Sequence, residues 1–223
     1  STDARPGLKP SAIVVSPTTV APATASSSSR RAAGRSDQHS RRPPEARGTS
    51  SEVVRTTDGT TATTALDPVG AMADMANRHK LWLHVDAAMA GSAMILPECR
   101  PLWEGIEGAD SLVLNPHKWL GVAFDCSLYY VRDPQHLVRV MTTNPSYLRS
   151  GVDEKVKNLR DWGIPLGRRF RALKLWAVLR CYGRRGLQER IREALRLAEL
   201  FEGWVGAEPG CELCAARRFS VVC

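Results

Sequence analysis

The chain has 223 residues, of which 43% are hydrophobic, and carries a net charge of +8 at pH 7. This length allows one or two domains, and no segment reaches the run of about 18 apolar residues that a membrane span needs. Its six cysteines are scattered and show no zinc-site spacing, so we predict no metal site and, with no signal-peptide pattern visible, a cytoplasmic protein.

Residues 1–56 differ in composition from the rest of the chain. They contain no Phe, Trp or Tyr, include Ser26–Ser29 and Pro43-Pro44, and hold +5 of the net charge. Such a segment buries too little apolar surface to offset its chain entropy, which predicts a disordered, low-complexity tail. A basic tail can touch nucleic acid, but no nucleic-acid-binding fold or aromatic platform is visible, so a solvated tail is the better interpretation. We therefore expect no nucleic-acid or membrane partner.

Two apolar runs predict neighbouring strands. In residues 81–86, alternation places His84 and Asp86 on one face and Val85 on the other, and small residues follow. Residues 93–110 contain two prolines and a helical run near 102–106, and residues 111–114 form the second strand. A strand, a crossover and a strand make a parallel pair, whose carboxyl ends share one rim. Asp86 and Lys118 are therefore expected on the same rim.

This pair of residue types suits pyridoxal 5'-phosphate (PLP). A lysine amine can condense with the aldehyde, and a carboxylate can keep the pyridine nitrogen protonated so that the ring accepts electrons. His117 beside the lysine could assist proton transfer. Taken alone, the aspartate could equally be a helix N-cap and the lysine a solvated side chain, so the residues by themselves leave both interpretations open.

The downstream pattern continues an α/β body. Residues 127–131 predict a strand, and Asp133 predicts the start of a short helix. Apolar residues recur at helical spacing over 168–182, and a second amphipathic helix is expected over 187–205. Gly183 and Gly186 are expected to interrupt the two.

Four segments resemble, in order and spacing, the group II PLP-dependent decarboxylases, and most closely the aromatic-L-amino-acid branch that acts on DOPA, tyrosine or tryptophan. These are His84–Ala88, Asn115–Trp119, Phe124–Ser127 and Ile164–Arg171. The resemblance implies fold type I, the aspartate-aminotransferase-like α/β fold, a homodimer, and release of an α-carboxylate as CO2. It also implies roles for individual residues: Lys118 as the Schiff-base lysine, Asp86 as the partner of the ring nitrogen, His117 as the histidine preceding the lysine, and Asn115, Thr61, His84 and Ala88 as cofactor-binding residues.

The resemblance runs from about Thr57 to Cys223, while the family's subunit is much longer, so we expect a C-terminal-half fragment. It divides the chain into a tail (1–56), the C-terminal part of the PLP-binding large domain (57–183), and a helix with the start of a truncated C-terminal domain (184–223). Residues 52–55 are at best a remnant of the strand that the family has before Gly59-Thr60-Thr61.

Leu159 leaves the product of the reaction open. Aligning Arg160-Asp161-Trp162 places it where animal and plant relatives carry a proton-donating tyrosine. The main prediction is decarboxylation to an amine, with His117 or water as the proton donor. The alternatives are decarboxylation with oxidative deamination to an aldehyde, or a catalytically incompetent fragment that retains only a folding or dimerisation role.

Overall fold

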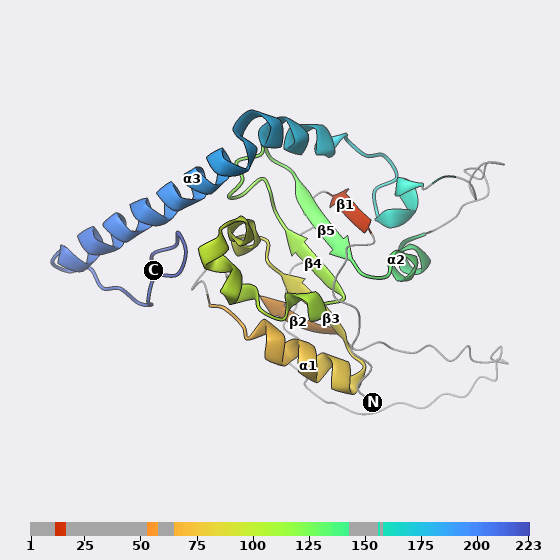
Figure 1. Ribbon diagram of the computed structural model, residues 1–223, viewed down its shortest axis with the longest axis horizontal. Coiled ribbons are helices and arrows are strands. Elements are labelled where there is room, and N and C mark those ends of the chain that lie inside the picture. The colour runs from red at the N-terminus through yellow and green to blue at the C-terminus, as the bar shows by residue number, and fades with distance from the viewer. Residues whose placement is uncertain (1–11, 17–52, 58–64, 143–155, 157) are drawn as a thin grey trace, which may run out of the picture.

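One mixed five-stranded sheet organises the chain (Figure 1). The computed structural model describes residues 12–16, 53–57, 65–142, 156 and 158–223. Its strands are β1 (Ala12–Ser16), β2 (Val53–Thr57), β3 (Trp82–Asp86), β4 (Ser111–Leu114) and β5 (Ser127–Val131). They lie in the order β1-β5-β4-β3-β2, with β2, β3 and β4 parallel and β5 antiparallel to both β4 and β1.

The predicted parallel pair is confirmed. β3 and β4 pair with His84 opposite Ser111 and Asp86 opposite Val113. Leu83 and Val85 are fully buried, whereas His84 and Asp86 on the other face are half-buried, as the alternation predicts. The buried face packs on α1 (Val69–His79), which contributes Val69 and two alanines to the same apolar cluster.

The prediction of one disordered tail over residues 1–56 is wrong for the two segments of it that the structure describes. β1 pairs with β5 at one edge of the sheet, and β2 pairs along the whole length of β3 at the other. Both segments carry short β-branched runs, and each gains a ladder of backbone hydrogen bonds from an existing strand. The overall composition of residues 1–56 is polar, and it concealed these short runs. β2 also shows that residues 53–57 form a full strand before Gly59, more than the remnant we expected.

The crossover between β3 and β4 contains no α-helix. Three short 3₁₀ helices occupy it: η1 (Ala90–Ile95), η2 (Pro97–Trp103) and η3 (Ile106–Gly108). Pro97 and Pro101 remove amide donors, and Gly105 takes a left-handed φ of 86°, so a continuous helix cannot pass through this segment. The expected helical run near residues 102–106 is therefore only a set of tight turns.

The C-terminal helices follow the predicted pattern closely. α2 (Pro134–Met141) begins at Asp133, whose side chain accepts a hydrogen bond from the Gln135 amide at 2.9 Å. α3 (Arg171–Ala207) consists of two helical stretches separated by a kink at Gly183, where φ is 62° and ψ is −178°. Gly186 does not interrupt the helix.

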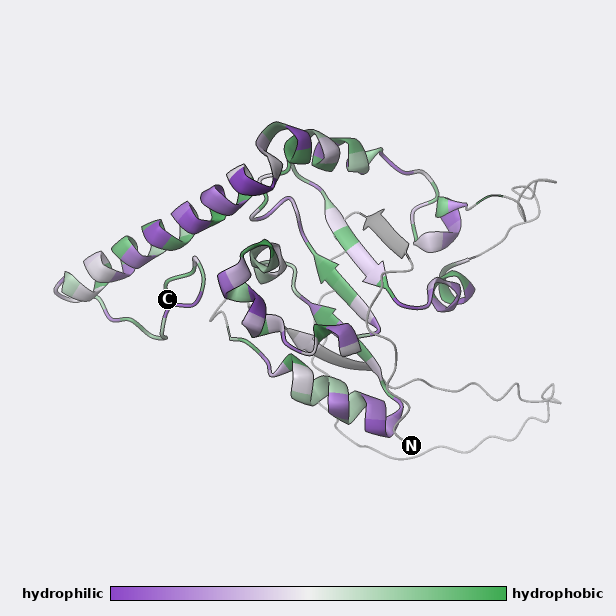
Figure 2. Cartoon of the chain, viewed as in Figure 1, coloured by the Kyte–Doolittle hydropathy of each residue, from purple (hydrophilic) through white to green (hydrophobic). Residues whose placement is uncertain are grey.

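The distal part of α3 extends away from the sheet, with apolar and polar residues alternating along it (Figures 1 and 2). Leu187 and Ile191 bury against the cluster that contains Trp103 and Phe219. Residues 208–223 form turns with a single bridge between Arg218 and Val221. No helix in the described part of the chain has both the length and the apolar character needed to cross a membrane.

Candidate active site

The carboxyl ends of β3 and β4 bring Asp86, Ala88, Asn115, His117 and Lys118 to one rim of the sheet. Beyond the strands, the Ala87 amide donates to the Val113 carbonyl at 3.0 Å, and the Asn115 amide donates to the Ala88 carbonyl at 3.1 Å. These two bonds continue the parallel ladder past Asp86 and hold the two chain segments side by side. The segment that carries Asp86 and the segment that leads to Lys118 are therefore joined by the backbone.

Asp86 has a fixed carboxylate. One oxygen, Oδ1, accepts a hydrogen bond from the Ala88 amide at 3.1 Å, and the side chain is half-buried. Ala88 thus acts through its backbone, since its amide holds Asp86 and its carbonyl holds Asn115.

Lys118 lies in the turn after β4 and is exposed. Its amide donates to the Asn115 carbonyl at 2.9 Å, and its carbonyl accepts from the Gly121 amide at 3.3 Å. The backbone of the lysine is therefore held by the turn, while its side chain is accessible to a reacting carbonyl compound.

Asn115 and His117 flank the lysine and are held by the segment before β5. Asn115 is buried, and its Oδ1 accepts from the Ser127 hydroxyl at 2.6 Å. The His117 Nδ1 lies 2.6 Å from the Cys126 carbonyl oxygen and 3.1 Å from the Cys126 amide nitrogen. Phe124 packs edge-on against the imidazole, with ring centroids 5.0 Å apart. The sequence predicts both site residues but not these partners.

Two of the predicted cofactor-binding residues are not placed at the rim by the structure. His84 shares the face of Asp86 but lies two residues, or about 7 Å, further back along the strand. Its Nδ1 is 2.8 Å from the Ser111 hydroxyl, which also accepts from the Trp82 indole at 2.9 Å. Through Ser111, His84 is therefore tied to the body of the sheet and not to the rim. Thr61 lies outside the described residues.

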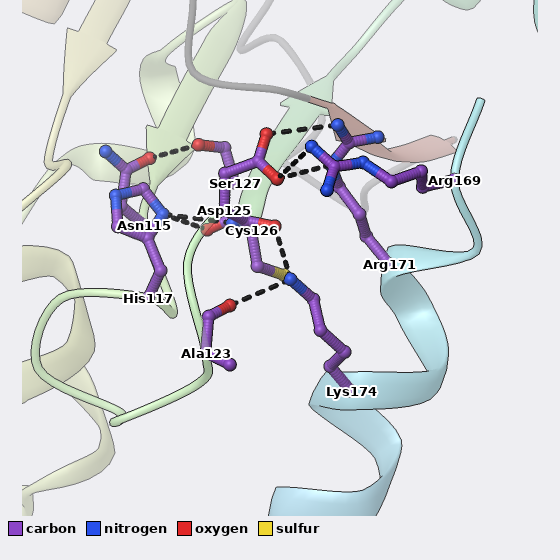
Figure 3. A network of polar contacts seen from close by, with 9 residues as sticks. All are labelled: Asn115, His117, Ala123, Asp125, Cys126, Ser127, Arg169, Arg171 and Lys174. Carbon is purple, nitrogen blue, oxygen red and sulfur yellow. Dashed lines mark hydrogen bonds and ion pairs between the residues drawn. The ribbon is translucent and has the colours of Figure 1, made fainter. Parts of the chain in front are cut away.

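A buried ion-pair network, which sequence reasoning missed, joins this segment to the start of α3 (Figure 3). Asp125 accepts from Arg171 Nε at 3.1 Å and Nη2 at 3.0 Å, and from Arg169 Nη2 at 3.2 Å. The hydrogen bonds from Arg171 are the main reason that the pKa of Asp125 lies below its ordinary value. Lys174 donates to the carbonyls of Ala123 and Asp125, both at 2.8 Å.

Arg168 and Arg169 belong to the segment Ile164–Arg171 that carries part of the family resemblance. Arg169 lies on Asp125, although its side chain stays 76% exposed. Arg168 is half-buried, and its Nε and Nη2 make no hydrogen bond to any described residue. Burial lowers the pKa of its guanidinium. Only Arg169, of these two, is brought to the segment that holds His117.

Leu159 opens η5 (Leu159–Trp162) and is exposed. The neighbouring Asp161 accepts a hydrogen bond from the Thr142 hydroxyl at 2.7 Å, which anchors this turn to the end of α2. Residues 143–155, which precede it, lie outside the described residues. A leucine side chain at this position cannot donate a proton.

The chemistry of this rim fits PLP. Asp86 at the end of β3 supplies a carboxylate, and the turn after the adjacent parallel strand β4 supplies an amide, an imidazole and a primary amine from Asn115, His117 and Lys118. Ligands of parallel α/β sheets bind at this edge. The donor set would hold a pyridine aldehyde at its ring nitrogen and at its carbonyl carbon.

Comparisons with known proteins agree with this geometry. A tryptophan decarboxylase of Camptotheca acuminata is 48% identical over 169 residues, which are 75% of this chain and 34% of the relative. A phenylacetaldehyde synthase of Arabidopsis thaliana is 47% identical over 167 residues, 74% of this chain and 34% of its own length. The crystal structure of Oryza sativa TDC with PLP and tryptamine matches with a TM-score of 0.71 at 46% identity, covering 76% of this chain and 35% of that one.

The chain spans about a third of the length of these relatives, and the fold that it shares with them is that of part of a type I PLP enzyme. The pyridoxal-dependent decarboxylase conserved domain matches residues 43–223. This match begins upstream of Thr57, where the resemblance by sequence motifs starts, and therefore includes β2. Because it covers most of the chain, the chain belongs to the pyridoxal-dependent decarboxylase family.

Proposed function

We propose that this chain supplies one wall of the active site of a PLP-dependent aromatic-L-amino-acid decarboxylase. The observation that carries the proposal is the placement of Asp86 and Lys118 on one rim, joined by the two hydrogen bonds that extend the β3–β4 ladder. The names of the relatives support an aromatic substrate, since they include a tryptophan decarboxylase and a phenylacetaldehyde synthase.

Each residue has a distinct task in this proposal. Lys118 would hold the cofactor through its amine, and Asp86 would hold a proton on the ring nitrogen. When bound, PLP supplies the electron sink for the bond that breaks at the substrate α-carbon. His117 is the nearest imidazole in sequence to the lysine and can take up or release a proton at Nε2, because Nδ1 faces Cys126. Buried Asn115 holds the turn that carries His117 and Lys118, because its carbonyl accepts from the Lys118 amide.

The aldehyde-forming reaction is the second candidate. Leu159 is exposed at the position where the sequence comparison expects a proton-donating tyrosine, and it has no proton to give. The phenylacetaldehyde synthase shows that a protein 47% identical to this chain bears the name of an aldehyde producer. The third candidate is a catalytically incompetent fragment that retains only a folding or dimerisation role, since the chain spans only a third of its relatives. We further propose that the complete catalyst is a homodimer.

Reductive trapping tests the cofactor role of Lys118. The chain is incubated with PLP and sodium borohydride, and mass spectrometry locates the reduced adduct among the six lysines. We expect Lys118 to be labelled in preference to the others, and Asp86→Asn to weaken this preference. Lys118→Arg should remove the main adduct, while Lys80→Arg, at an exposed position on the far end of α1, should leave it in place. Equal labelling of Lys118 and Lys80 would contradict the proposal.

Product analysis then separates the three candidates. The chain with PLP is given L-tryptophan, L-tyrosine or L-DOPA, and CO2, amine, aldehyde, ammonia and peroxide are measured. Stoichiometric amine supports the decarboxylase and rules out the aldehyde reaction, whereas aldehyde with ammonia and peroxide does the reverse. A folded chain that releases no CO2 from any of the three substrates identifies the incompetent fragment.

A further inference from the structure

Cys214 and Cys223 are neighbours in the segment that follows α3. After the helix the chain turns back (Figure 1), and it closes a tight turn in which Arg218 pairs with Val221 and Phe219 takes a left-handed φ of 55°. On either side of this turn the chain runs antiparallel, and the Cys214 amide donates a hydrogen bond to the Cys223 backbone oxygen at 2.9 Å. The turn therefore brings the backbones of the two cysteines into direct contact.

That hydrogen bond limits the distance between the two cysteine Cα atoms. The covalent bonds from each Cα to the bonded nitrogen or oxygen add at most about 4 Å to the 2.9 Å separation, so the Cα atoms lie within about 7 Å of each other. Cysteines that are joined by a disulfide usually have Cα atoms about 4.4–6.8 Å apart. The backbone thus already holds Cys214 and Cys223 at a separation that a disulfide can span.

Both thiols are also accessible. Cys214 is exposed and Cys223 is half-buried, and the Cys214 Sγ lies 3.9 Å from the Glu212 carbonyl oxygen. A thiol is a weak donor, so this long contact does not prevent the Cys214 side chain from rotating toward its neighbour. By contrast, Cys99 and Cys126 are buried, and burial raises the pKa of both thiols, which keeps them protonated and unreactive. Oxidation should therefore discriminate between the cysteines of this chain.

The loop between the two cysteines is packed against the rest of the chain. Phe219 is buried, and its ring centroid lies 5.7 Å from that of Trp103 and 5.8 Å from that of Trp119. Arg217, in the same loop, donates to Glu202 of α3 at 2.7 Å. A bridge between the two ends of this loop would restrict the unfolded chain more than the folded one, in which the ends already meet. It should therefore stabilise the packing of the loop.

We propose that Cys214 and Cys223 form a thiol–disulfide exchange site, which takes small disulfides of the glutathione class and closes the loop with a reversible, stabilising bridge. The exposed Cys214 thiolate attacks one sulfur of glutathione disulfide, whose S–S bond breaks and releases one glutathione. The Cys223 thiolate then attacks the Cys214 sulfur of the mixed disulfide and releases the second glutathione. Two protein thiols are oxidised, one glutathione disulfide is reduced, and the two cysteine protons pass to the released glutathiones. Excess glutathione reverses the exchange.

Peptide mapping after oxidation with glutathione disulfide tests this assignment. The folded chain is treated with the reagent, its remaining thiols are blocked with N-ethylmaleimide, and it is digested with trypsin, which cuts after Arg217 and Arg218, between the two cysteines. The proposed bridge therefore joins two separate peptides, whereas a bridge between Cys211 and Cys214 would lie within one peptide. We expect the joined peptides to carry the main disulfide, and exposed Cys181 to carry only a glutathione adduct.

Two variants and a stability measurement complete the test. Cys223→Ser should abolish the joined peptides and leave Cys214 as a glutathione adduct, whereas Cys211→Ser, the matched control, should leave the bridge in place. In the unmodified chain the bridge should raise the thermal midpoint, followed by circular dichroism, by about 4–10 °C, the effect of closing a short loop in a chain of this size. Oxidised Cys223→Ser should show no such rise.

Three outcomes would overturn the proposal: a main disulfide between Cys211 and Cys214, glutathione adducts alone on the folded chain, or a bridged chain whose thermal midpoint does not rise. All three are measured on the unmodified chain, so they do not depend on how the variants fold. None of them involves PLP or Lys118, so failure of this proposal is distinct from failure of the proposed function.

Discussion

At the scale of single residues, Asp125 shows how one buried carboxylate connects stability to the site. It accepts three hydrogen bonds from two arginines, of which Arg171 is itself buried. Removing one member of a buried pair leaves the other charge without compensation, which costs more than the pair contributes. The side chain that pairs with Arg171 thus directly precedes Cys126, whose backbone contacts the His117 Nδ1.

Acid should therefore weaken the fold partly through Asp125. Because its pKa is lower in the folded chain than in the unfolded one, its contribution is fully present above an ordinary aspartate pKa of about 3.9 and is lost as the pH falls through the folded value. We expect the thermal midpoint of Asp125→Asn to lie below that of the unmodified chain at pH 7, and the gap to narrow below about pH 4. Thermal unfolding followed by circular dichroism from pH 7 to pH 2.5 measures this.

Glu193→Gln is the control for that series, since Glu193 pairs with Arg196 on the exposed surface of α3. The thermal midpoint of Glu193→Gln should stay close to that of the unmodified chain at every pH. If the difference in thermal midpoint between Asp125→Asn and the unmodified chain were the same at pH 7 and pH 3, the acid sensitivity could not be assigned to this carboxylate.

The sequence predicted the site residues better than their supports. Asp86, Asn115, His117 and Lys118 follow apolar strands directly, so the local pattern places them at the rim. Asp125 and Arg171 are 46 positions apart, and only the three-dimensional path of α3 brings them together. The one signal for this pair was that both lie in segments that carry the family resemblance. Spacing and alternation cannot report such a contact.

At the scale of elements, glycine and proline account for most differences between prediction and structure. The prolines of the crossover turned an expected helical run into 3₁₀ turns. In α3, Gly183 and Gly186 were given equal weight by sequence, but only Gly183 takes a backbone conformation outside the helical region. The break coincides with the boundary that we set at residue 183, while the division into domains remains a prediction.

The two glycines Gly183 and Gly203 of α3 should respond oppositely to alanine. At Gly183 a Cβ meets nothing within 4 Å, but its φ of 62° with ψ near 180° suits only glycine, so Gly183→Ala should lower the free energy of unfolding by about 1–3 kcal/mol. At Gly203, in regular exposed helix with the same open space, Gly203→Ala should raise it by about 0.5–1 kcal/mol. Urea unfolding measures both.

A stabilised Gly183→Ala with increased helical circular dichroism would show that α3 straightens without loss, and that the kink is not required by the packing around it. Gly203→Ala tests whether the comparison is sound, because its effect rests on helix propensity alone. If the free energy of unfolding changed in the same direction for both variants, the backbone conformation at Gly183 would not determine the effect of Gly183→Ala.

At the scale of the whole molecule, many large apolar side chains are exposed on the described residues. Several lie on or just before α3, and the most exposed of them are Ile164, Phe170, Trp176 and Trp204. The chain also spans about a third of the length of its relatives. Local sequence patterns cannot tell a face that packs within the chain from one that packs on a second copy.

The proposed homodimer predicts that the chain associates with itself through this α3 surface. Sedimentation velocity over a range of concentrations should show a monomer–dimer equilibrium rather than a single monomeric species. Trp176→Gln should weaken it by about 1–3 kcal/mol of association free energy, the scale of one aromatic anchor in an interface. Arg180→Gln, one turn further along the same helix and also exposed, is the matched control and should have a much smaller effect. A chain that stays monomeric at all concentrations would contradict self-association, and equal weakening by both variants would place the contact elsewhere than on Trp176.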